Sequence, residues 1–492
     1  MQLREILKDI QPLNITGDVE KEINNIVFNS KLASPNSLFV ALKGTQHDGI
    51  SYVSEAISKG AVAILAQEYP VPRHNGITYI QASDVRKTAA LLAAAFYQHP
   101  AKKLNLMGIT GTNGKTTTSY LIASILKEAG RKTGIIGTIN YQYGNKTISA
   151  FLTTPESLDI QRLFKEMVTE GVSHVVMEVS SHALFYKRVA GCQFQLAIFT
   201  NLSQDHLDFH KDMEAYFACK KQLFTHYLGS KGKAIINLDD PYGKRILEEI
   251  KCPCITYGLS SKADIWTENF QISINKTTAY IHTPIESFSI CSPLIGKPNL
   301  YNILAAVAAG IAMDLPINII KTGVEKVSSI CGRLERFSQN GIEVLVDYAH
   351  TPDALEQVLK TLRPLCQGRL ITVFGCGGNR DKGKRPLMGK IASELSDMVI
   401  ITDDNPRNEP SRQIIQDIEM GIKKNALYYI IPKRPQAIAM AIRGAQKGDV
   451  VVIAGKGHED YQIVGNKKYP LSDREEVKKA LKNAANRELE VD

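Results

Sequence analysis

The chain has 492 residues, of which 44% are hydrophobic and 22% charged, and it is too long to fold around one hydrophobic core, so we expect about three domains. Its longest apolar runs fall short of the ~18 residues that cross a bilayer, which argues against a membrane span. The net charge of +9 fits either a nucleic-acid surface or clefts for anionic small molecules, and the mixing of basic with acidic residues favours the second.

The N-terminus carries acidic residues early and has no long apolar core. It does not predict a secretory signal, so we expect a cytoplasmic protein. The eight cysteines are scattered, and the only close pair, Cys252 and Cys254, lacks the CxxC spacing of zinc and redox sites. We therefore expect reduced, structural thiols.

The first hundred residues alternate short strand-like runs with helical stretches at 50–59 and 85–97, which predicts a small α/β domain. The expected strands are 24–28, 37–42, 61–66 and 77–81. A polar segment containing Pro100 follows as a linker.

Two larger blocks follow the linker. Apolar runs at 104–110, 133–139, 173–180, 196–203 and 233–239 predict a mostly parallel central sheet. From residue 331 onward, strands and helices alternate as in an open doubly wound α/β domain, with one long helical stretch before the last strand. We predict domain boundaries at residues 1–98, 99–331 and 332–492.

The stretch GITGTNGKTTTSY, Gly108–Tyr120, lies between an apolar strand and an apolar-faced helix. Ile109 stands where the common GxxxxGK[ST] pattern requires glycine. An ordinary glycine turn is one interpretation, but the strand–turn–helix context favours a phosphate loop. Backbone N–H groups there attract anions, Lys115 can reach terminal phosphates, and a threonine hydroxyl can bind Mg²⁺.

Two later strands end in candidate metal contacts. Glu178 ends an apolar strand, where a second contact to the metal is expected, although an incidental strand-end glutamate has the same pattern. The loop after the next strand holds Asp205, His206, Asp208 and His210. His206 is our candidate, while Asp205 or Asp208 also suits a helix cap.

A lysine falls within the apolar stripe of the helix predicted after this loop. The stripe has the spacing i, i+3, i+7 and i+10 and consists of Phe217, Lys220, Phe224 and Tyr227. Lys221 points away from it. Desolvation in the stripe would disfavour the charged amine and make it a better nucleophile, unless the side chain extends to solvent.

Charged motifs follow several strands of the third block. They are GRLERF at 332–337, DYAHTPD at 347–353, GCGGNRDKGKRP at 375–386, DDNPRNEP at 403–410 and AGKGHEDYQ at 454–462. Singly, each is compatible with a solvated loop, but together they predict a ligand site at one sheet edge. Pro406 biases Asn405 to an extended conformation, which places Arg407 on a loop where it suits a carboxylate.

The chain resembles the Mur ligases of bacterial peptidoglycan synthesis over essentially its whole length. The motifs that carry the resemblance are, in order, GITGTNGKTTT, MEVSSHAL, TNLSQDHLDFH, KPNLYNILAA, GRLER, DYAHTPDAL, GCGGNRDKGKRP and DNPR. The family spells its phosphate loop G[TS]xGK[ST], which accounts for the shifted glycine. DNPR is typical of members that add meso-diaminopimelate, whose second carboxylate suits Arg407.

The resemblance implies a small N-terminal α/β UDP-binding domain, a central P-loop ATPase-like domain with a parallel sheet, and a C-terminal doubly wound Rossmann-like domain. It implies ATP as co-substrate and Mg²⁺ as cofactor. ATP is expected at Gly111, Thr112, Asn113, Gly114, Lys115, Thr116 and Thr117, with Asn299, Asn302, Arg333 and Asp347 nearby. Metal is expected at Thr116, Glu178, His206 and Lys220, the last as a carbamate (N6-carboxylysine), and the catalytic residues are Lys115, Glu178, His206 and Lys220.

The resemblance also implies two further substrate sites. UDP-N-acetylmuramoyl-L-alanyl-D-glutamate is expected at Ser30, Thr45, Gln46, His47, Thr153, Thr154, Ser180 and Arg188. meso-Diaminopimelate is expected at Arg380, Asp404, Asn405, Pro406, Arg407, Gly455 and Glu459. Two positions depart from the family pattern, since Tyr186 replaces a common Gln and Asn379 a common Asp.

The implied reaction is a two-step ligation through an acyl phosphate, performed by a monomer, with closure of the third domain over the phosphate loop. Lysine-adding and folylpolyglutamate-type ligases are alternatives within the superfamily. DNPR argues against the first, and Thr116, where folate enzymes usually have Gly, against the second. A P-loop protein that binds nucleic acid is a more remote alternative, for which the chain has neither an NKxD motif nor a basic tract.

Overall fold

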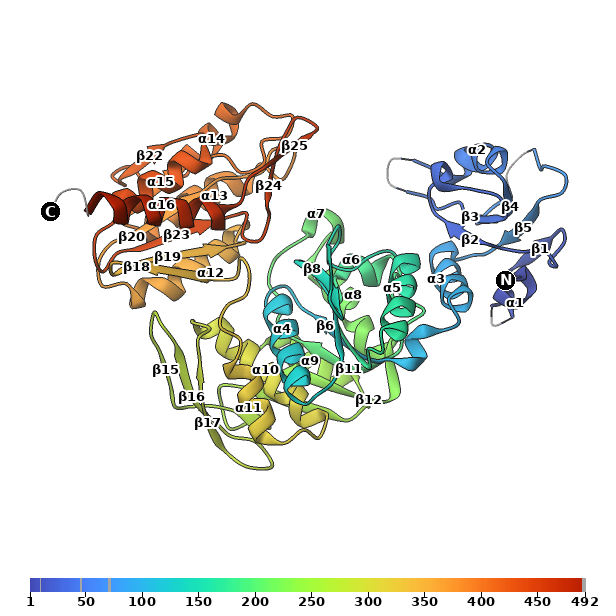
Figure 1. Cartoon of the computed structure of the whole chain (residues 1–492), viewed down its shortest axis with the longest axis horizontal. Coiled ribbons are helices and arrows are strands. Elements are labelled where there is room, and N and C mark those ends of the chain that lie inside the picture. The colour runs from blue at the N-terminus through green and yellow to red at the C-terminus, as the bar shows by residue number, and fades with distance from the viewer. Residues whose placement is uncertain (9, 45–46, 70–71, 489–492) are drawn as a thin grey trace. The chain divides into compact units, whose positions relative to one another are not determined.

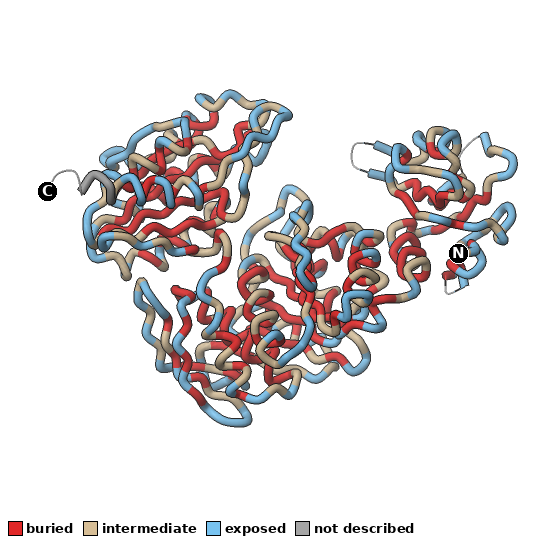
Figure 2. The backbone as a smooth tube through the Cα atoms, in the orientation of Figure 1, coloured by how far each residue is buried: buried red, intermediate tan, exposed pale blue. Residues whose placement is uncertain are grey.

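The computed structural model describes the whole chain except residues 9, 45–46, 70–71 and 489–492, and side-chain surroundings up to residue 484 (Figure 1). Its contacts group the chain into two compact units. Unit 1 comprises residues 1–258, 262–265 and 305–323, and unit 2 comprises 259–261, 266–304 and 324–492. Buried residues follow the strands of the large sheets and the helices against them (Figure 2).

The N-terminal part of unit 1 is a five-stranded sheet in the order β1-β5-β4-β3-β2. Its strands are β1 (Asn14–Thr16), β2 (Asn25–Val27), β3 (Ser37–Val40), β4 (Ala61–Ala66) and β5 (Thr78–Gln81). Its helices are α1 (Leu3–Leu7), α2 (Val53–Ser58) and α3 (Val85–Phe96), with 3-10 turns η1 (Ser30–Leu32) and η2 (Gly49–Tyr52). Two buried clusters flank the sheet, so the predicted small α/β domain is observed.

The rest of unit 1 is built on a nine-stranded sheet in the order β14-β13-β12-β11-β6-β10-β7-β8-β9. The strands are β6 (Asn105–Thr110), β7 (Thr133–Ile136), β8 (Asn140–Tyr143), β9 (Lys146–Ser149), β10 (His174–Glu178), β11 (Phe194–Phe199), β12 (Leu228–Asn237), β13 (Cys254–Gly258) and β14 (Ile265–Trp266). The pairs from β13 through β7 are parallel, whereas β8 and β9 add an antiparallel edge. The prediction of a mostly parallel sheet is therefore correct.

Helices connect these strands, as parallel pairing requires. They are α4 (Lys115–Glu128), α5 (Ser157–Thr169), α6 (Ser181–Phe185), α7 (Leu207–His210), α8 (Met213–Thr225) and α9 (Pro241–Glu249), with the 3-10 turn η3 (Pro100–Lys103) before β6. The helices α10 (Lys297–Ala312) and α11 (Ile317–Glu325) follow the sheet in sequence. Among the described helices, none has both the length and the apolarity needed to span a bilayer.

Unit 2 contains a small antiparallel sheet that the sequence analysis did not predict. Its strands are β15 (Phe270–Ile272), β16 (Thr277–Ile281) and β17 (Phe288–Ser292). In β16 and β17, buried and exposed residues alternate, which leaves one face of the sheet towards solvent.

The largest part of unit 2 is a six-stranded sheet in the order β18-β19-β23-β20-β21-β22. Its strands are β18 (Glu335–Gln339), β19 (Ile342–Asp347), β20 (Leu370–Phe374), β21 (Met398–Ile401), β22 (Tyr428–Ile430) and β23 (Val450–Ala454). All pairs are parallel except β18 with β19. Parallel strands buried on both faces are continuously apolar, as the VVVIA sequence of β23 shows.

Helices cover both faces of this sheet, where two buried clusters lie. They are α12 (Pro352–Leu362), α13 (Lys384–Leu395), α14 (Ser411–Glu419), α15 (Arg434–Arg443) and α16 (Asp473–Glu488), with the 3-10 turn η4 (Arg363–Leu365). The predicted long helical stretch was wrong, because α14 and α15 are separated by β22. A hairpin of β24 (Tyr461–Val464) and β25 (Lys467–Pro470) follows β23.

Candidate active site

The predicted phosphate loop connects β6 to α4. Gly114 precedes the helix at a positive φ of 87°. A side chain at Gly111 would collide with Thr200, whose Oγ1 lies 1.9 Å from the position of a Cβ, so the close backbone approach requires glycine there. The Lys115 ammonium donates to the carbonyls of Gly111 (2.9 Å) and Thr112 (2.8 Å), which holds it over the loop. The expected strand, turn and helix are therefore in place.

Glu178, at the end of β10, is 1% exposed and lies beside the loop. Its Oε2 accepts hydrogen bonds from the hydroxyls of Thr116 (3.0 Å) and Thr138 (2.8 Å), and its Oε1 from the Thr138 N–H (2.9 Å). The structure thus brings together two residues that the sequence predicted as metal contacts. It adds Thr138, whose position just after the strand at 133–136 was the available signal.

This oxygen cluster fits Mg²⁺, which prefers carboxylate and hydroxyl oxygens and retains several waters. Within the described part of the chain, no group of three or more His, Cys, Asp or Glu side chains is arranged to hold a metal. A single carboxylate with neighbouring hydroxyls suits a hydrated Mg²⁺ bound to phosphate better than a fully protein-ligated transition metal.

Lys220, on α8, is 1% exposed, and its Nζ donates to the Gly111 carbonyl at 2.8 Å. Burial, followed by the nearby Lys115 cation, lowers the pKa of its amine well below the ordinary value. Lys221 is partly exposed and pairs with Glu249. The predicted orientation is therefore observed, and Lys220 does not extend to solvent.

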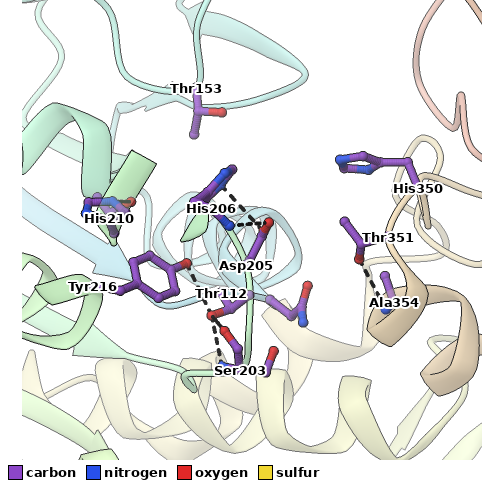
Figure 3. Close-up of polar contacts among 12 residues, drawn as sticks. Thr112, Thr153, Ser203, Asp205, His206, His210, Tyr216, His350, Thr351 and Ala354 are labelled. Atoms are coloured by element: carbon purple, nitrogen blue, oxygen red, sulfur yellow. Dashed lines mark hydrogen bonds and ion pairs between the residues drawn. The ribbon is translucent and has the colours of Figure 1, made fainter. Parts of the chain in front are cut away.

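His206 directly precedes α7 and has a left-handed conformation with φ 54°. Figure 3 shows it next to Asp205, whose Oδ2 lies 3.5 Å from Nε2, and shows the Tyr216 hydroxyl directed at Thr112 (3.3 Å). Burial is the main cause that lowers the pKa of His206, and the nearby Lys115 and Lys220 also contribute. The imidazole is therefore disposed to stay neutral, which is the form that can ligate a metal.

The neighbouring Asp205 and Asp208 do not cap α7, although Asp205 accepts the His206 N–H at 2.8 Å. His210 instead bonds the Ser181 hydroxyl at 2.9 Å. A further histidine, His182 on α6, lies with its ring centroid 4.9 Å from that of His206. Sequence reasoning missed His182, although it lies within the MEVSSHAL segment.

Four of the residues expected to bind the UDP-sugar peptide lie around β10. The Thr154 hydroxyl donates to the Glu178 carbonyl (2.8 Å) and accepts the Ser180 N–H (3.0 Å). Arg188 donates to the Thr154 carbonyl (3.1 Å). The Thr153 hydroxyl lies 3.1 Å from that of Thr138, so these residues adjoin the phosphate loop.

The remaining residues of this set belong to the five-stranded sheet. Ser30 donates to Glu55 at 2.6 Å, and His47 lies 3.4 Å from the Tyr52 hydroxyl. Thr45 and Gln46 lie outside the described residues. The hydrogen bonds of the two described members, Ser30 and His47, therefore lie within the N-terminal part of unit 1.

Four residues of unit 2 were expected near the nucleotide. Asn299 and Asn302 lie together on α10, and Asp347 lies near Arg333. Asn302 donates to the Asn299 side chain at 3.1 Å on α10. The Asp347 carboxylate accepts the N–H groups of Leu334 and Ala349, each at 2.8 Å. Burial raises the pKa of Asp347, and nearby Arg333 opposes this effect.

The residues expected to bind the amino acid follow three strands of the six-stranded sheet. Arg380 follows β20, Asp404, Asn405, Pro406 and Arg407 follow β21, and Gly455 and Glu459 follow β23. Asn405 donates to Glu459 at 3.1 Å, and a Cβ at Gly455 would meet the Asp404 carboxylate at 2.8 Å. The loop after β20 joins this cluster through Gly378, whose N–H donates to the Asn405 carbonyl at 2.9 Å, whereas Arg380 itself is exposed and donates to the Asn379 carbonyl at 3.5 Å.

Arg407 lies on a loop, as predicted, in the left-handed region with φ 52°. Its N–H donates to Ile463 (3.0 Å), its carbonyl accepts from Gly465 (2.8 Å), and its guanidinium donates to Gly378 (2.9 Å). Three contacts therefore hold a backbone conformation that a non-glycine residue rarely adopts.

Arg385 belongs to the charged motif at 375–386, but its burial was not predicted from the sequence. Arg385 has a fully buried side chain and pairs with Glu409 (2.9 Å) and Asp417 (2.8 Å). Because Arg385 lies within the GCGGNRDKGKRP motif and Glu409 follows Arg407 closely, this network joins the two loops.

Three family models match the chain. They describe the Mur ligase middle domain (residues 109–310), the Mur ligase, glutamate ligase domain (332–457) and the Mur ligase family, catalytic domain (22–99).

Curated relatives match along nearly their whole length. The UDP-N-acetylmuramoyl-L-alanyl-D-glutamate--2,6-diaminopimelate ligase of Geobacter metallireducens is 44% identical over 99% of this chain and 99% of its own length. A Clostridium acetobutylicum protein of that name, ligase 1, is 44% identical over 98% and 99%. A solved structure of a protein with the same name has 32% identity and a TM-score of 0.71, and covers 98% of this chain and 99% of its own. Folylpolyglutamate synthase from Mycobacterium tuberculosis, complexed with ADP, shares the fold at 18% identity and a TM-score of 0.63 over 76% of this chain and 92% of its own.

Proposed function

Because the chain belongs to the Mur ligase family, we propose that it is the ATP-dependent ligase that adds meso-diaminopimelate to UDP-N-acetylmuramoyl-L-alanyl-D-glutamate in peptidoglycan precursor synthesis. Its relatives at 44% identity bear the name of this activity. We further propose that it acts in the cytoplasm as a monomer, with domains at residues 1–98, 99–331 and 332–492.

The observation that carries the choice of amino acid is the Asp404–Arg407 loop. Arg407 offers a planar donor for a second carboxylate, which diaminopimelate has and lysine lacks. Glu459 lies beside the same loop, in contact with Asn405, and supplies a carboxylate for an ammonium group. A cation and an anion held at one sheet edge suit a zwitterionic substrate with an additional acid group.

The arrangement around the phosphate loop supports ATP as the co-substrate and Mg²⁺ as the cofactor. Thr116, Glu178, His206 and a carbamate on Lys220 would hold the metal, which supplies positive charge opposite the phosphates when bound. The lowered pKa of Lys220 favours the uncharged amine, the form that reacts with CO₂. A carbamate would turn this buried amine into an anion beside the loop.

The reaction has two steps. The D-glutamyl side-chain carboxylate attacks the γ-phosphorus of ATP, which forms an acyl phosphate and releases ADP. The uncharged amine of diaminopimelate then attacks the acyl carbon, so that an amide forms, phosphate leaves and the amine loses a proton. Lys115, held at the loop carbonyls, would neutralise charge on the transferring phosphoryl group.

An amino-acid competition assay tests this function. Purified protein, ATP and the UDP-muramoyl dipeptide are incubated with equal concentrations of meso-diaminopimelate and L-lysine, and the products are identified by mass spectrometry. We expect the diaminopimelate product to predominate, and Arg407→Ala to raise the KM for diaminopimelate on the order of ten-fold or more, as expected for a lost charged hydrogen bond.

The matched control is Arg412→Ala, which changes an exposed arginine in the same unit. Predominance of the lysine product would assign the chain to the lysine-adding ligases instead. ATP hydrolysis stimulated by nucleic acid, and not by the muramoyl nucleotide, would place it outside this pathway.

A further inference from the structure

One buried cation at the proposed amino-acid site has no role in the function above. Lys456 directly follows Gly455 at the end of β23, and its side chain is fully buried. Lysine is almost never completely buried unless its ammonium is paired. The groups around the Lys456 ammonium must therefore stabilise it in this buried position.

The Lys456 ammonium joins two residues of the proposed site. It donates to Asn405 Oδ1 at 3.1 Å and to Glu459 Oε2 at 2.9 Å. It also lies 5.5 Å from the centre of the Tyr461 ring, which can stabilise a cation. The Lys456 ammonium is thus one of the groups that join the loops after β21 and β23.

These contacts determine how Asn405 and Glu459 are presented. Asn405 Oδ1 accepts from both Lys456 and the Ile463 N–H (2.9 Å), and its Nδ2 donates to Glu459 Oε2. The side-chain amide of Asn405 is therefore engaged within the protein. Both described bonds to Glu459 end on Oε2, which orients the other carboxylate oxygen, Oε1.

The acidic side chains around Lys456 also favour a cation at this position. Arg434 and Asp473 form a buried pair of their own, with both bonds at 2.7 Å. Asp404 and Glu459 are the nearby acids, and Lys456 bonds one of them. Without Lys456, Glu459 would lose its ion-pair partner in a site that is largely removed from water.

We propose that Lys456 is a positioning residue for the amino-acid substrate, which fixes Glu459 and Asn405 so that Oε1 of Glu459 receives an ammonium group of the incoming amino acid. The inference rests on the proposed function, because it takes these residues as the amino-acid site. Lys456 acts through its two partners and does not itself contact the substrate.

Steady-state kinetics of Lys456→Met test this role, since methionine has a similar volume and no charge. We expect the KM for diaminopimelate to rise on the order of ten-fold, as expected when a buried charge pair is broken. The KM values for ATP and the UDP-muramoyl dipeptide should stay within about two-fold, because the bonds that Lys456 makes in the described part of the chain go to Asn405 and Glu459 of the amino-acid site. Lys447→Met, an exposed lysine just before β23, is the matched control.

Lys456→Gln provides a second test if the methionine variant does not fold, because glutamine keeps a hydrogen-bond donor without the charge. An unchanged KM for diaminopimelate in a folded variant would overturn the proposal. Parallel losses in kcat and all three KM values, with a lower melting temperature, would do so as well, because they indicate a purely structural lysine. If the wild type uses only L-lysine, the proposed function fails, and the same comparison made with L-lysine still tests Lys456.

Discussion

At the scale of single residues, the metal-binding role proposed for Lys220 opposes stability. Burial lowers the pKa of its amine in the folded chain, whereas the unfolded chain binds a proton below the ordinary value of 10.5. The unfolded state therefore binds more protons between the folded and ordinary pKa values, and this residue makes stability rise with pH in that window. We expect Lys220→Met to stabilise the fold at pH 7 by roughly 1 kcal/mol or more and to abolish ligation.

Chemical unfolding in CO₂-depleted buffer at pH 7 and pH 9.5 measures this effect. The advantage of Lys220→Met should shrink at the higher pH, where the unfolded wild-type chain approaches its own deprotonation. Lys221→Met, next to it and partly exposed, should shift stability little. A methionine variant less stable than the wild type at pH 7 would show that the fold depends on the Lys220 amine.

The residues that could be predicted from the sequence are those with a local signal. Lys220 interrupts a helical apolar stripe, and Glu178 ends an apolar strand, so each position follows from periodicity alone. Thr138, Lys456 and Arg385 each have a partner that is distant in sequence, respectively Glu178, Asn405 and Glu409, and no spacing pattern reveals such partners. Lys456 lies in the AGKGHEDYQ motif at 454–462, but its full burial results from packing at the sheet edge.

At the scale of elements, the hairpin β24–β25 supports the Arg407 loop. The backbone of Ile463 accepts from Arg407, and Gly465 donates back to it. Gly465 has a φ of +58°, and a Cβ there would meet only the Asn408 side chain at 3.9 Å. Gly465→Val would therefore act through backbone strain of about 1–2 kcal/mol and not through a clash.

We expect Gly465→Val to raise the KM for diaminopimelate a few-fold, roughly three- to ten-fold, because the Arg407 backbone loses part of its support. The KM for ATP should not change. Asn466→Val is the matched control, since this neighbouring position lies outside the left-handed region. Equal effects of the two variants on diaminopimelate binding would contradict a role for the Gly465 conformation.

The elements that the sequence predicted best are the buried parallel strands, whose continuous apolar runs differ from their surroundings. Residues 404–448 were wrongly predicted as one long helical stretch because β22 has three exposed residues and no alternation, so it resembles part of a helix. The small sheet at 270–292 was missed for a similar reason, since its strands are short and lie between polar turns. Short, partly exposed strands depend on their neighbours more than on their own sequence.

At the scale of the whole molecule, each of the buried clusters described above lies within one of the two units, and the proposed substrate sites divide between the units. The described residues expected to bind the UDP-muramoyl dipeptide belong to unit 1, and those expected to bind diaminopimelate belong to unit 2. A ligand stabilises the structure that binds it, by about 2.7 kcal/mol at 100 times its Kd. Each substrate should therefore protect a different set of backbone amides.

Hydrogen exchange followed by mass spectrometry measures this protection peptide by peptide. We expect the UDP-muramoyl dipeptide to slow exchange around residues 153–188 and diaminopimelate to slow it around 404–407 and 455–465, because local opening must then release the ligand. Arg188→Ala should remove only the first response, and Arg407→Ala only the second. If the UDP-muramoyl dipeptide slowed exchange only in unit 2, the proposed division of substrates between the units would be wrong. A ligand held by residues near β10 must slow exchange in the nine-stranded sheet of unit 1, which contains β10.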